Sequence, residues 1–235
     1  MEVKIVFNND VVSDKFISGW GFSCLVDNRV LFDTGEKAEY LFNNMRNLNI
    51  NISSIEMAVI SHDHWDHTGG LWELLEKRKG LKVYACPHFS RAFKDKVKKL
   101  KAELIEAEKI IEITKNIFIT GEILKEYRGI PEQALAIKTS KGITVITGCS
   151  HPGIVRIIEK VKEANPSEKI CLVFGGFHLM NSDKREVRII AERLKEMGVE
   201  KAGPTHCTGY EAQEIFKEEY ADNFISIKAG QVFEV

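Results

Sequence analysis

The stretch SHDHWDHTGG, at residues 61–70, follows a short apolar run and decides how the chain is interpreted. It places His62, His64, Asp66 and His67 within six positions. If the backbone stays extended beyond the preceding strand, period-two alternation puts His62, His64 and Asp66 on one side. His67 then joins them as the chain turns into a helix. Imidazole and carboxylate groups bind zinc and iron, and four of them suit two adjacent metal ions better than one.

We therefore expect the first two histidines to face one ion, and Asp66 with His67 to face the other. Further ligands must come from distant sequence. His151, His178 and His206 each follow a predicted strand beside small residues, in TGCSHPG, GGFHL and PTHCTG. We expect His151 to complete the first metal site and His206 the second. For His178, metal ligation, substrate contact and a structural role all stay open, and contact with substrate or acid–base chemistry is favoured.

Two other residue types accompany the histidines. Asp33, in VLFDTG, ends a predicted strand, where its carboxylate can accept the second ring N–H of a ligand histidine and so orient it. The alternative is an acid that only forms the turn before Gly35. Cys149 precedes His151 and is either a metal-site thiolate or a small buried residue. Cys207 is interpreted as a small buried residue.

The order of strand and helix patterns predicts an α+β protein. The 235 residues are 44% hydrophobic and 29% charged, which is typical of a globular domain. We expect one domain over 1–235, made of two halves at about 1–115 and 116–235 whose element order repeats. Two sheets packed face to face, with helices outside, would bury the apolar faces of these elements.

Hydrophobic periodicity predicts the individual elements. The predicted strands are 3–7, 22–26, 29–33, 57–61, 82–86, 117–120, 134–140, 143–147, 169–176, a short strand or turn at 201–206, and closing strands within 224–235. The predicted helices are 36–49, 71–79, 154–164, 186–198 and 210–220, with a further amphipathic stretch over 91–104.

Charge and cysteine usage limit the partners. The net charge is -1, which offers no bulk attraction to nucleic acid or to an anionic membrane. No apolar run approaches the roughly 20 residues that span a bilayer. Five scattered cysteines argue against a disulfide framework. We expect a cytoplasmic protein whose partner is a small molecule rather than nucleic acid or a membrane.

The pattern H62-D-H64-W-D66-H67, with Asp33 upstream and His151 and His206 downstream, resembles the metallo-β-lactamase superfamily. This resemblance implies an αβ/βα four-layer sandwich, with two mixed sheets face to face, helices outside and the metal site at one edge. The resemblance also implies that His62 and His64 bind one ion and that Asp66 and His67 bind the other, as expected from the spacing of these residues.

A narrower resemblance covers GFSCLV, LFDTG, SHDHWDHTGGL, VITGCSHPGI, GGFHL and HCTG. These segments are similar to the dihydropteroate-synthase-like subgroup, which includes 7,8-dihydropterin-6-methyl-4-(β-D-ribofuranosyl)aminobenzene-5′-phosphate synthase. The resemblance implies a phosphorylated or pterin-like substrate. Superfamily members with two metals usually carry a bridging Asp at a strand end. Here the comparable ends read TGCSH and FGGFH, and Cys149 stands where that carboxylate would be.

We hypothesise a hydrolase that uses two divalent ions (Zn, Fe or Mn) to activate water against a phosphoester or related substrate. Asp66 would bind metal and orient the nucleophile, and His178 would stabilise developing charge. One alternative is a pterin-type transferase that releases pyrophosphate. A di-iron redox protein is disfavoured because no flavin-binding segment is recognised. A non-catalytic metal-binding module is disfavoured because glycine-flanked histidines indicate an open rim.

Overall fold

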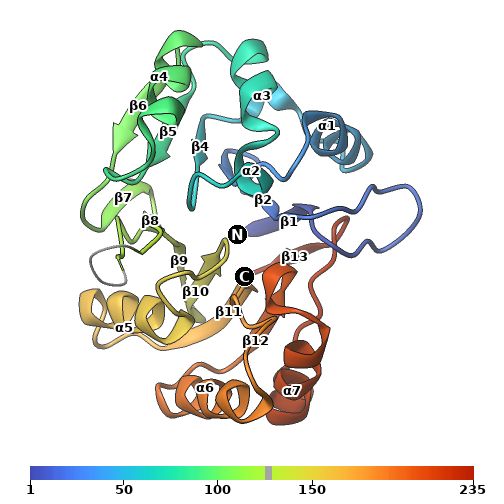
Figure 1. Cartoon of the computed structure of the whole chain (residues 1–235), viewed down its shortest axis with the longest axis vertical. Coiled ribbons are helices and arrows are strands. Elements are labelled where there is room, and N and C mark those ends of the chain that lie inside the picture. The colour runs from blue at the N-terminus through green and yellow to red at the C-terminus, as the bar shows by residue number, and fades with distance from the viewer. Residues whose placement is uncertain (125–128) are drawn as a thin grey trace. The chain divides into compact units, whose positions relative to one another are not determined.

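The computed structural model describes residues 1–124 and 129–235, which form two compact units (Figure 1). Unit 1 comprises residues 1–108 and 228–235, and unit 2 comprises residues 109–227. Each unit contains one mixed β-sheet with its own helices.

Unit 1 contains a seven-stranded sheet in the order β13-β1-β2-β3-β4-β5-β6. Its strands are β1 (Glu2–Phe7), β2 (Ser23–Val26), β3 (Val30–Phe32), β4 (Met57–Val59), β5 (Lys82–Ala85), β6 (Glu103–Glu106) and β13 (Val232–Glu234). Pairing is parallel from β3 to β6 and antiparallel among β13, β1, β2 and β3. Its helices are α1 (Ala38–Asn47), η1 (Ile52–Ser54), α2 (Trp65–Thr68), α3 (Leu71–Lys77) and α4 (Arg91–Lys99).

The hairpin between β2 and β3 sets the position of the residue that follows it. Asp27 and Asn28 have φ of 49° and 56°, and short polar residues tolerate this left-handed turn, which reverses the chain tightly. β3 then runs parallel to β4, so the carboxyl ends of both strands lie at the same edge of the sheet. Asp33 leaves one of these ends and Ser61 follows the other.

Unit 1 buries apolar helix faces against its sheet. The contributing residues are Leu41 and Met45 of α1, Leu71, Leu74 and Leu75 of α3, Phe93 and Val97 of α4, and Leu25, Leu31, Ala58 and Val83 of the strands. This spacing of three to four residues along each helix produces one apolar stripe, which explains why the helices form only against the sheet.

Unit 2 contains a six-stranded sheet in the order β12-β11-β10-β9-β8-β7. Its strands are β7 (Ile111–Thr114), β8 (Ile117–Ile119), β9 (Leu135–Thr139), β10 (Gly142–Thr147), β11 (Ile170–Gly176) and β12 (Ala202–Thr205). Its helices are α5 (Ile154–Ala164), α6 (Lys184–Glu196), η3 (His206–Thr208), α7 (Tyr210–Tyr220) and η4 (Ala221–Asn223). Because β10, β11 and β12 are parallel neighbours, their carboxyl ends meet at one edge.

The core of unit 2 joins α5, α6 and α7 to this sheet (Figure 1). It includes Ile157, Ile158 and Val161 of α5, Val187, Ala191 and Leu194 of α6, Ala212 and Phe216 of α7, and Ala136, Val145, Val173 and Ala202 of the strands. The parallel pairing of β10, β11 and β12 sets where their ends emerge, and the helices cover the apolar side of this sheet.

Most predicted elements are confirmed within a few residues, and two predictions are wrong. The amphipathic stretch 91–104 is helical only to Lys99, because Lys101 adopts a φ of 61° and residues from Glu103 pair with β5 as the unpredicted strand β6. The predicted closing strands reduce to β13, because residues 224–231 contribute only isolated bridges. β7 was also not predicted.

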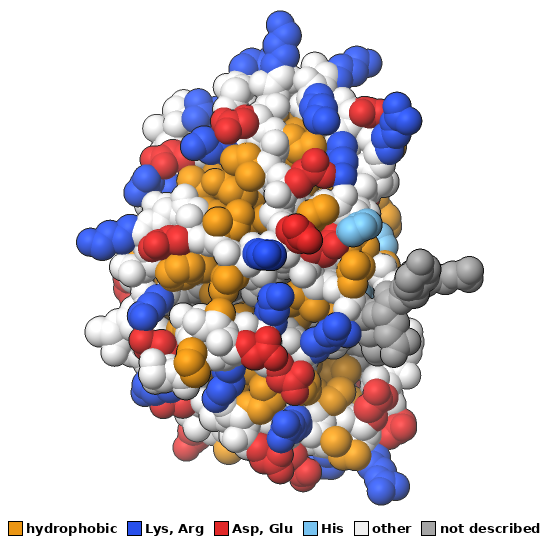
Figure 2. All heavy atoms as spheres, turned by 90° about the vertical axis from the view of Figure 1, so that its left-hand side faces the viewer, with side chains coloured by type: hydrophobic (Ala, Val, Ile, Leu, Met, Phe, Trp, Pro, Cys, Tyr) orange, Lys and Arg blue, Asp and Glu red, His pale blue; other side chains and the backbone are white. Residues whose placement is uncertain are grey.

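Charged side chains are mixed on the surface. Figure 2 shows Lys and Arg interspersed with Asp and Glu over the face that it draws. Arg188, for example, pairs with Glu218 and Glu219 at 2.6 and 2.9 Å. Among residues 1–124 and 129–235, no helix combines the length and apolar character that crossing a bilayer requires.

The packing of α6 predicts a stability difference within one helix. Leu194 is fully buried and Ile189 is 54% exposed. We expect Leu194→Ala to lower the free energy of unfolding by about 2–5 kcal/mol, because it leaves a cavity. Ile189→Ala should change it by less than about 0.5 kcal/mol. Urea unfolding followed by circular dichroism measures both, and equal effects would contradict this account of the core.

Candidate functional site

A buried carboxylate organises the histidine segment of unit 1. Asp33 is fully buried and adopts a left-handed φ of 53° directly after β3. Its Oδ1 accepts a hydrogen bond from the Ser61 N–H at 2.7 Å. Its Oδ2 accepts from the Ser61 hydroxyl and from Nδ1 of His67, both at 2.7 Å. Since the Ser61 hydroxyl hydrogen points to Asp33, Nδ1–H of His62 donates to Ser61 Oγ at 2.9 Å.

These contacts assign the tautomers of two histidines. With Nδ1 protonated in both His62 and His67, Nε2 is the nitrogen that can present a lone pair to a metal ion. The carboxylate of Asp33 therefore orients His67 directly and His62 through Ser61. This is the arrangement that holds metal-binding imidazoles in many proteins.

Helix α2 carries Asp66 and His67, which corrects the alternation argument. Extended backbone ends at His64, the N-cap with φ -70° and ψ 151°. Asp66 therefore reaches the cluster from a helical turn, because the four residues after His64 are helical. The His67 carbonyl accepts from the Thr34 N–H at 2.9 Å and from its hydroxyl at 2.8 Å, which fixes α2 to the loop after β3.

Close backbone approach requires glycine beside α2. A Cβ on Gly69 would lie 1.9 Å from the Glu36 carbonyl oxygen, and one on Gly21 would lie 2.2 Å from the Asp66 carbonyl oxygen. A side chain at Gly69 would displace the loop that follows Asp33, and one at Gly21 would displace α2.

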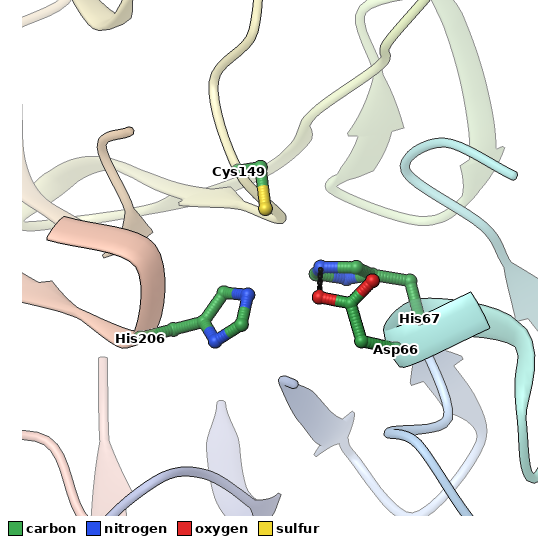
Figure 3. A group of neighbouring side chains, drawn as sticks. All are labelled: Asp66, His67, Cys149 and His206. Carbon is green, nitrogen blue, oxygen red and sulfur yellow. Dashed lines mark ion pairs between the residues drawn. The ribbon is translucent and has the colours of Figure 1, made fainter. Parts of the chain in front are cut away.

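Three imidazoles and one carboxylate lie together in unit 1. The ring centroid of His62 is 4.6 Å from that of His64 and 4.2 Å from that of His67. Oδ2 of Asp66 is 3.5 Å from Nε2 of His67, the ion pair dashed in Figure 3. His62 and His67 are fully buried, and Asp66 is 5% exposed. Nitrogen and oxygen donors this close fit divalent ions such as zinc, iron or manganese.

The local field at His67 favours a cation. Burial alone lowers the pKa of this imidazole, but the charge and hydrogen bond of Asp33, together with Asp66, outweigh burial and raise the pKa to about 10. Two buried carboxylates beside one imidazole therefore stabilise positive charge there, whether a proton or a metal ion supplies it.

In unit 2, the predicted histidines follow the ends of neighbouring parallel strands: His151 follows β10, His178 follows β11 and His206 follows β12. His178, His206 and Ser150, which precedes His151, have left-handed φ values of 54°, 52° and 64°. Left-handed backbone at non-glycine residues costs free energy and persists where surrounding contacts enforce it, often at functional sites. His206 is 2% exposed, His151 is half-buried and His178 is exposed.

Glu132 is a site residue that the sequence analysis missed. Its fully buried carboxylate accepts the N–H groups of Cys149 and Ser150 at 2.8 and 2.7 Å through Oε1. Oε2 accepts the N–H of His151 at 2.8 Å. Glu132 thus holds the loop that carries His151. Its only sequence signal is an acid directly before the apolar strand at 134–140.

Cys149 and Cys207 are both buried beside these histidines. Burial raises the pKa of the Cys207 thiol, but hydrogen bonds with Cys149 and His178 and the charge of His206 outweigh burial and hold it well below its usual range. Figure 3 shows Cys149 and His206 on the strand ends of unit 2. Cys207 is small and buried as expected, but its neighbours also lower the pKa of its thiol.

A cavity of about 340 Å³ in unit 2 includes both His151 and His178 in its wall. The two ring centroids are 4.3 Å apart. The remaining lining is partly apolar, with Ile154, Phe177 and Leu179. This size and mixture suit a small ligand. A larger cavity of about 720 Å³ beside α1 and α3 in unit 1 is lined by none of the candidate residues.

Each unit therefore gathers its own share of the predicted site. Unit 1 brings together His62, His64, Asp66, His67 and Asp33. Unit 2 places Cys149, His151, His178 and His206 at one sheet edge. That His151 and His206 share metal ions with the ligands of unit 1 stays a prediction.

Known proteins resemble this chain in sequence. Residues 28–130 match the family model described as a beta-lactamase superfamily domain. The chain is 32% identical to 7,8-dihydropterin-6-methyl-4-(beta-D-ribofuranosyl)-aminobenzene-5′-phosphate synthase of Methanocaldococcus jannaschii, over 92% of this chain and 90% of the relative.

Solved structures resemble it in fold. Tm1679, described as a metal-dependent hydrolase of the beta-lactamase superfamily, superposes with a TM-score of 0.86 and 32% identity, covering 100% of this chain and 99% of that one. The metallo-beta-lactamase fold protein YhfI of Bacillus subtilis superposes with a TM-score of 0.71 at 15% identity, covering 99% of each chain. The predicted fold, with two mixed sheets and their helices, is thereby confirmed.

The contacts of Asp33 predict a loss of metal affinity on substitution. Asp33→Asn keeps the size of the side chain but turns an amide N–H₂ toward Ser61 or His67, so that His67 loses its fixed tautomer. We expect the affinity for Zn²⁺ to fall about 10–100-fold. Competition with a fluorescent chelator measures it. Asp63→Asn is the matched control, since Asp63 accepts from the Ser90 N–H instead; an equal loss there would contradict the role of Asp33.

Proposed function

Because this chain belongs to the metallo-β-lactamase superfamily, in its dihydropteroate-synthase-like subgroup, we propose that it is a metal-dependent hydrolase of a small phosphorylated molecule. We propose two divalent ions, zinc, iron or manganese. Their ligands would be His62, His64, Asp66 and His67 of unit 1 and His151 and His206 of unit 2.

The contacts of Asp33 carry this proposal. A protein that needed the histidines only for packing would not require three donors on one buried carboxylate, two imidazoles in the same tautomer, and Asp66 beside Nε2 of His67. Burying these polar groups costs free energy that packing alone does not recover. Orientation of Nε2 toward a cation explains the cost.

When bound, divalent ions supply a Lewis acid and lower the pKa of coordinated water toward neutrality. The chain's own residues do the rest. The Asp66 carboxylate would bind metal and accept a hydrogen bond from the attacking water. His178, exposed on the wall of the 340 Å³ cavity, would donate a hydrogen bond to a phosphate oxygen. Asp33 and Glu132 keep the ligand-bearing loops in place.

A pterin-type transferase is the second candidate. Identity of 32% over 92% of the chain to a protein named as a synthase favours it. In such a reaction the bond between a pterin-methyl carbon and a diphosphate oxygen breaks, and that carbon bonds to an arylamine phosphate, which loses a proton. The cavity near His178, with Phe177 in its lining, would accept a ring.

We also propose that the protein works in the cytoplasm. None of the five cysteines forms a disulfide, which supports a reducing, cytoplasmic environment.

Metal removal tests the proposed activity. We expect chelator-treated protein to lose phosphoester hydrolysis on a substrate panel, and added Zn²⁺, Mn²⁺ or Fe²⁺ to restore it. His62→Ala should lower activity by about 100-fold or more, because it removes a ligand. His88→Ala is the control, since His88 is exposed and belongs to neither ligand group.

The same preparations separate the two candidates. Pyrophosphate released from a pterin-methyl diphosphate only when an arylamine phosphate is present would favour the transferase. Release without the second substrate would favour the hydrolase. Full activity in metal-free protein would exclude both.

A further inference from the structure

Three soft or borderline ligands lie together within unit 2. Sγ of Cys149, Sγ of Cys207 and a ring nitrogen of His178 are all within 4.8 Å of one another. Each follows one of three neighbouring parallel strands, β10, β11 and β12. Parallel pairing of these strands therefore brings together residues that are far apart in the sequence. The metal ligands proposed above are nitrogen and oxygen atoms, whereas two of the three ligand atoms of this cluster are sulfur.

The backbone between the two cysteines is adapted to their close approach. A Cβ on Gly176 would lie 2.6 Å from Sγ of Cys207 and 3.1 Å from Cα of Cys149. A side chain at this position would clash with the Cys207 thiol and with the backbone that leads into Cys149. The Gly176 N–H donates to the Gly148 carbonyl at 3.1 Å, and its carbonyl accepts from the Ser150 hydroxyl at 2.7 Å. These bonds hold the ends of β10 and β11 against each other.

The loops on both sides of the cluster are also fixed. Glu132 binds the Cys149 N–H at 2.8 Å. The Thr208 hydroxyl accepts from the Phe177 N–H at 3.0 Å and donates to the Thr205 carbonyl at 2.6 Å, which ties the loop after β11 to η3. His178 itself is held in a left-handed backbone conformation with φ of 54°. A preformed ligand set loses little freedom when an ion binds.

Zinc–ligand bond lengths fit this cluster. Tetrahedral zinc has Zn–S bonds of about 2.3 Å and Zn–N bonds of about 2.0 Å, so its ligand atoms lie roughly 3.3–3.8 Å apart. The ligand atoms here lie within 4.8 Å of one another, so they must approach by up to about 1.5 Å to reach that spacing. Of the three residues, His178 is exposed and the two cysteines are buried.

We propose that Cys149, Cys207 and His178 form a thiolate-containing site for a soft or borderline cation such as Zn²⁺, in addition to the nitrogen and oxygen ligand groups. Binding breaks the two S–H bonds, forms two metal–sulfur bonds and releases two protons to solvent. Three protein ligands leave a fourth position to water or a substrate atom. Imidazole has two ring nitrogens, so ligation through one leaves the other for the substrate contact proposed for His178.

X-ray absorption of the zinc-loaded, reduced wild-type protein tests this site directly. We expect sulfur scatterers at about 2.3 Å from zinc. The double variant Cys149→Ser/Cys207→Ser should lose them and bind one ion fewer per chain, measured by mass spectrometry of the native protein. Cobalt substitution provides a second readout, since thiolate ligation adds a charge-transfer absorption band that nitrogen and oxygen ligands do not produce.

Cys171→Ser is the matched control. Cys171 lies on β11, near the opposite end of the strand from His178, and its Sγ contacts the Ile143 carbonyl at 3.3 Å. It should keep both the sulfur signal and the metal count. Circular dichroism establishes that each variant is folded.

Two results would overturn the proposal. One is reduced wild-type protein that binds zinc with no sulfur neighbour, which leaves the nitrogen and oxygen sites of the proposed function intact. The other is a sulfur signal that persists in the double variant, since another cysteine would then supply it. The wild-type spectrum decides the matter even if the double variant fails to fold.

Discussion

The buried carboxylate of Asp33 is the constraint on which the histidine cluster of unit 1 depends. A buried charge persists only when hydrogen bonds or opposite charge compensate for lost hydration. Here the Ser61 N–H, the Ser61 hydroxyl and His67 Nδ1 provide that compensation. Because these donors follow β4 and lie on α2, satisfying one carboxylate fixes the ends of two strands and the short helix after them. Four residues would be too few to hold α2 in place without such contacts.

In unit 2 the buried carboxylate of Glu132 has a comparable role. Glu132 collects three backbone N–H groups from residues 149–151, so a loop that would otherwise leave buried donors unsatisfied becomes ordered. Ser150, whose N–H donates to this carboxylate, adopts a left-handed φ of 64°. In both units a carboxylate outside the proposed ligand set binds the segment that carries ligands: Asp33 contacts the His67 ring, and Glu132 accepts the His151 N–H.

The donor chemistry of the two units differs. Unit 1 offers imidazole nitrogen and carboxylate oxygen, which accept zinc, iron or manganese with little preference. Unit 2 adds the thiols of Cys149 and Cys207 beside its imidazoles. Sulfur shifts selection toward softer ions. A chain that combines both donor types could therefore bind different metal ions at its two ligand groups, whatever the relative concentrations of those ions in the cell.

Features that depend on local spacing could be predicted from the order of residues. The histidine motif, the hairpin at 22–33 with Asp27 and Asn28 in its turn, and helices 154–164 and 210–220 follow from periodicity and turn chemistry, which act over a few residues. The folded arrangement alone sets the features that depend on pairing between distant segments. It moved Asp66 onto a helical turn, turned residues 103–106 into a strand beside β5, and gave Glu132 its three donors. It also brought Sγ of Cys149 and Sγ of Cys207 within 4.8 Å of each other at the ends of β10 and β12, which flank β11. Periodicity records which face of an element is apolar, but not which strand will lie beside it, and these contacts exist only once that choice is made.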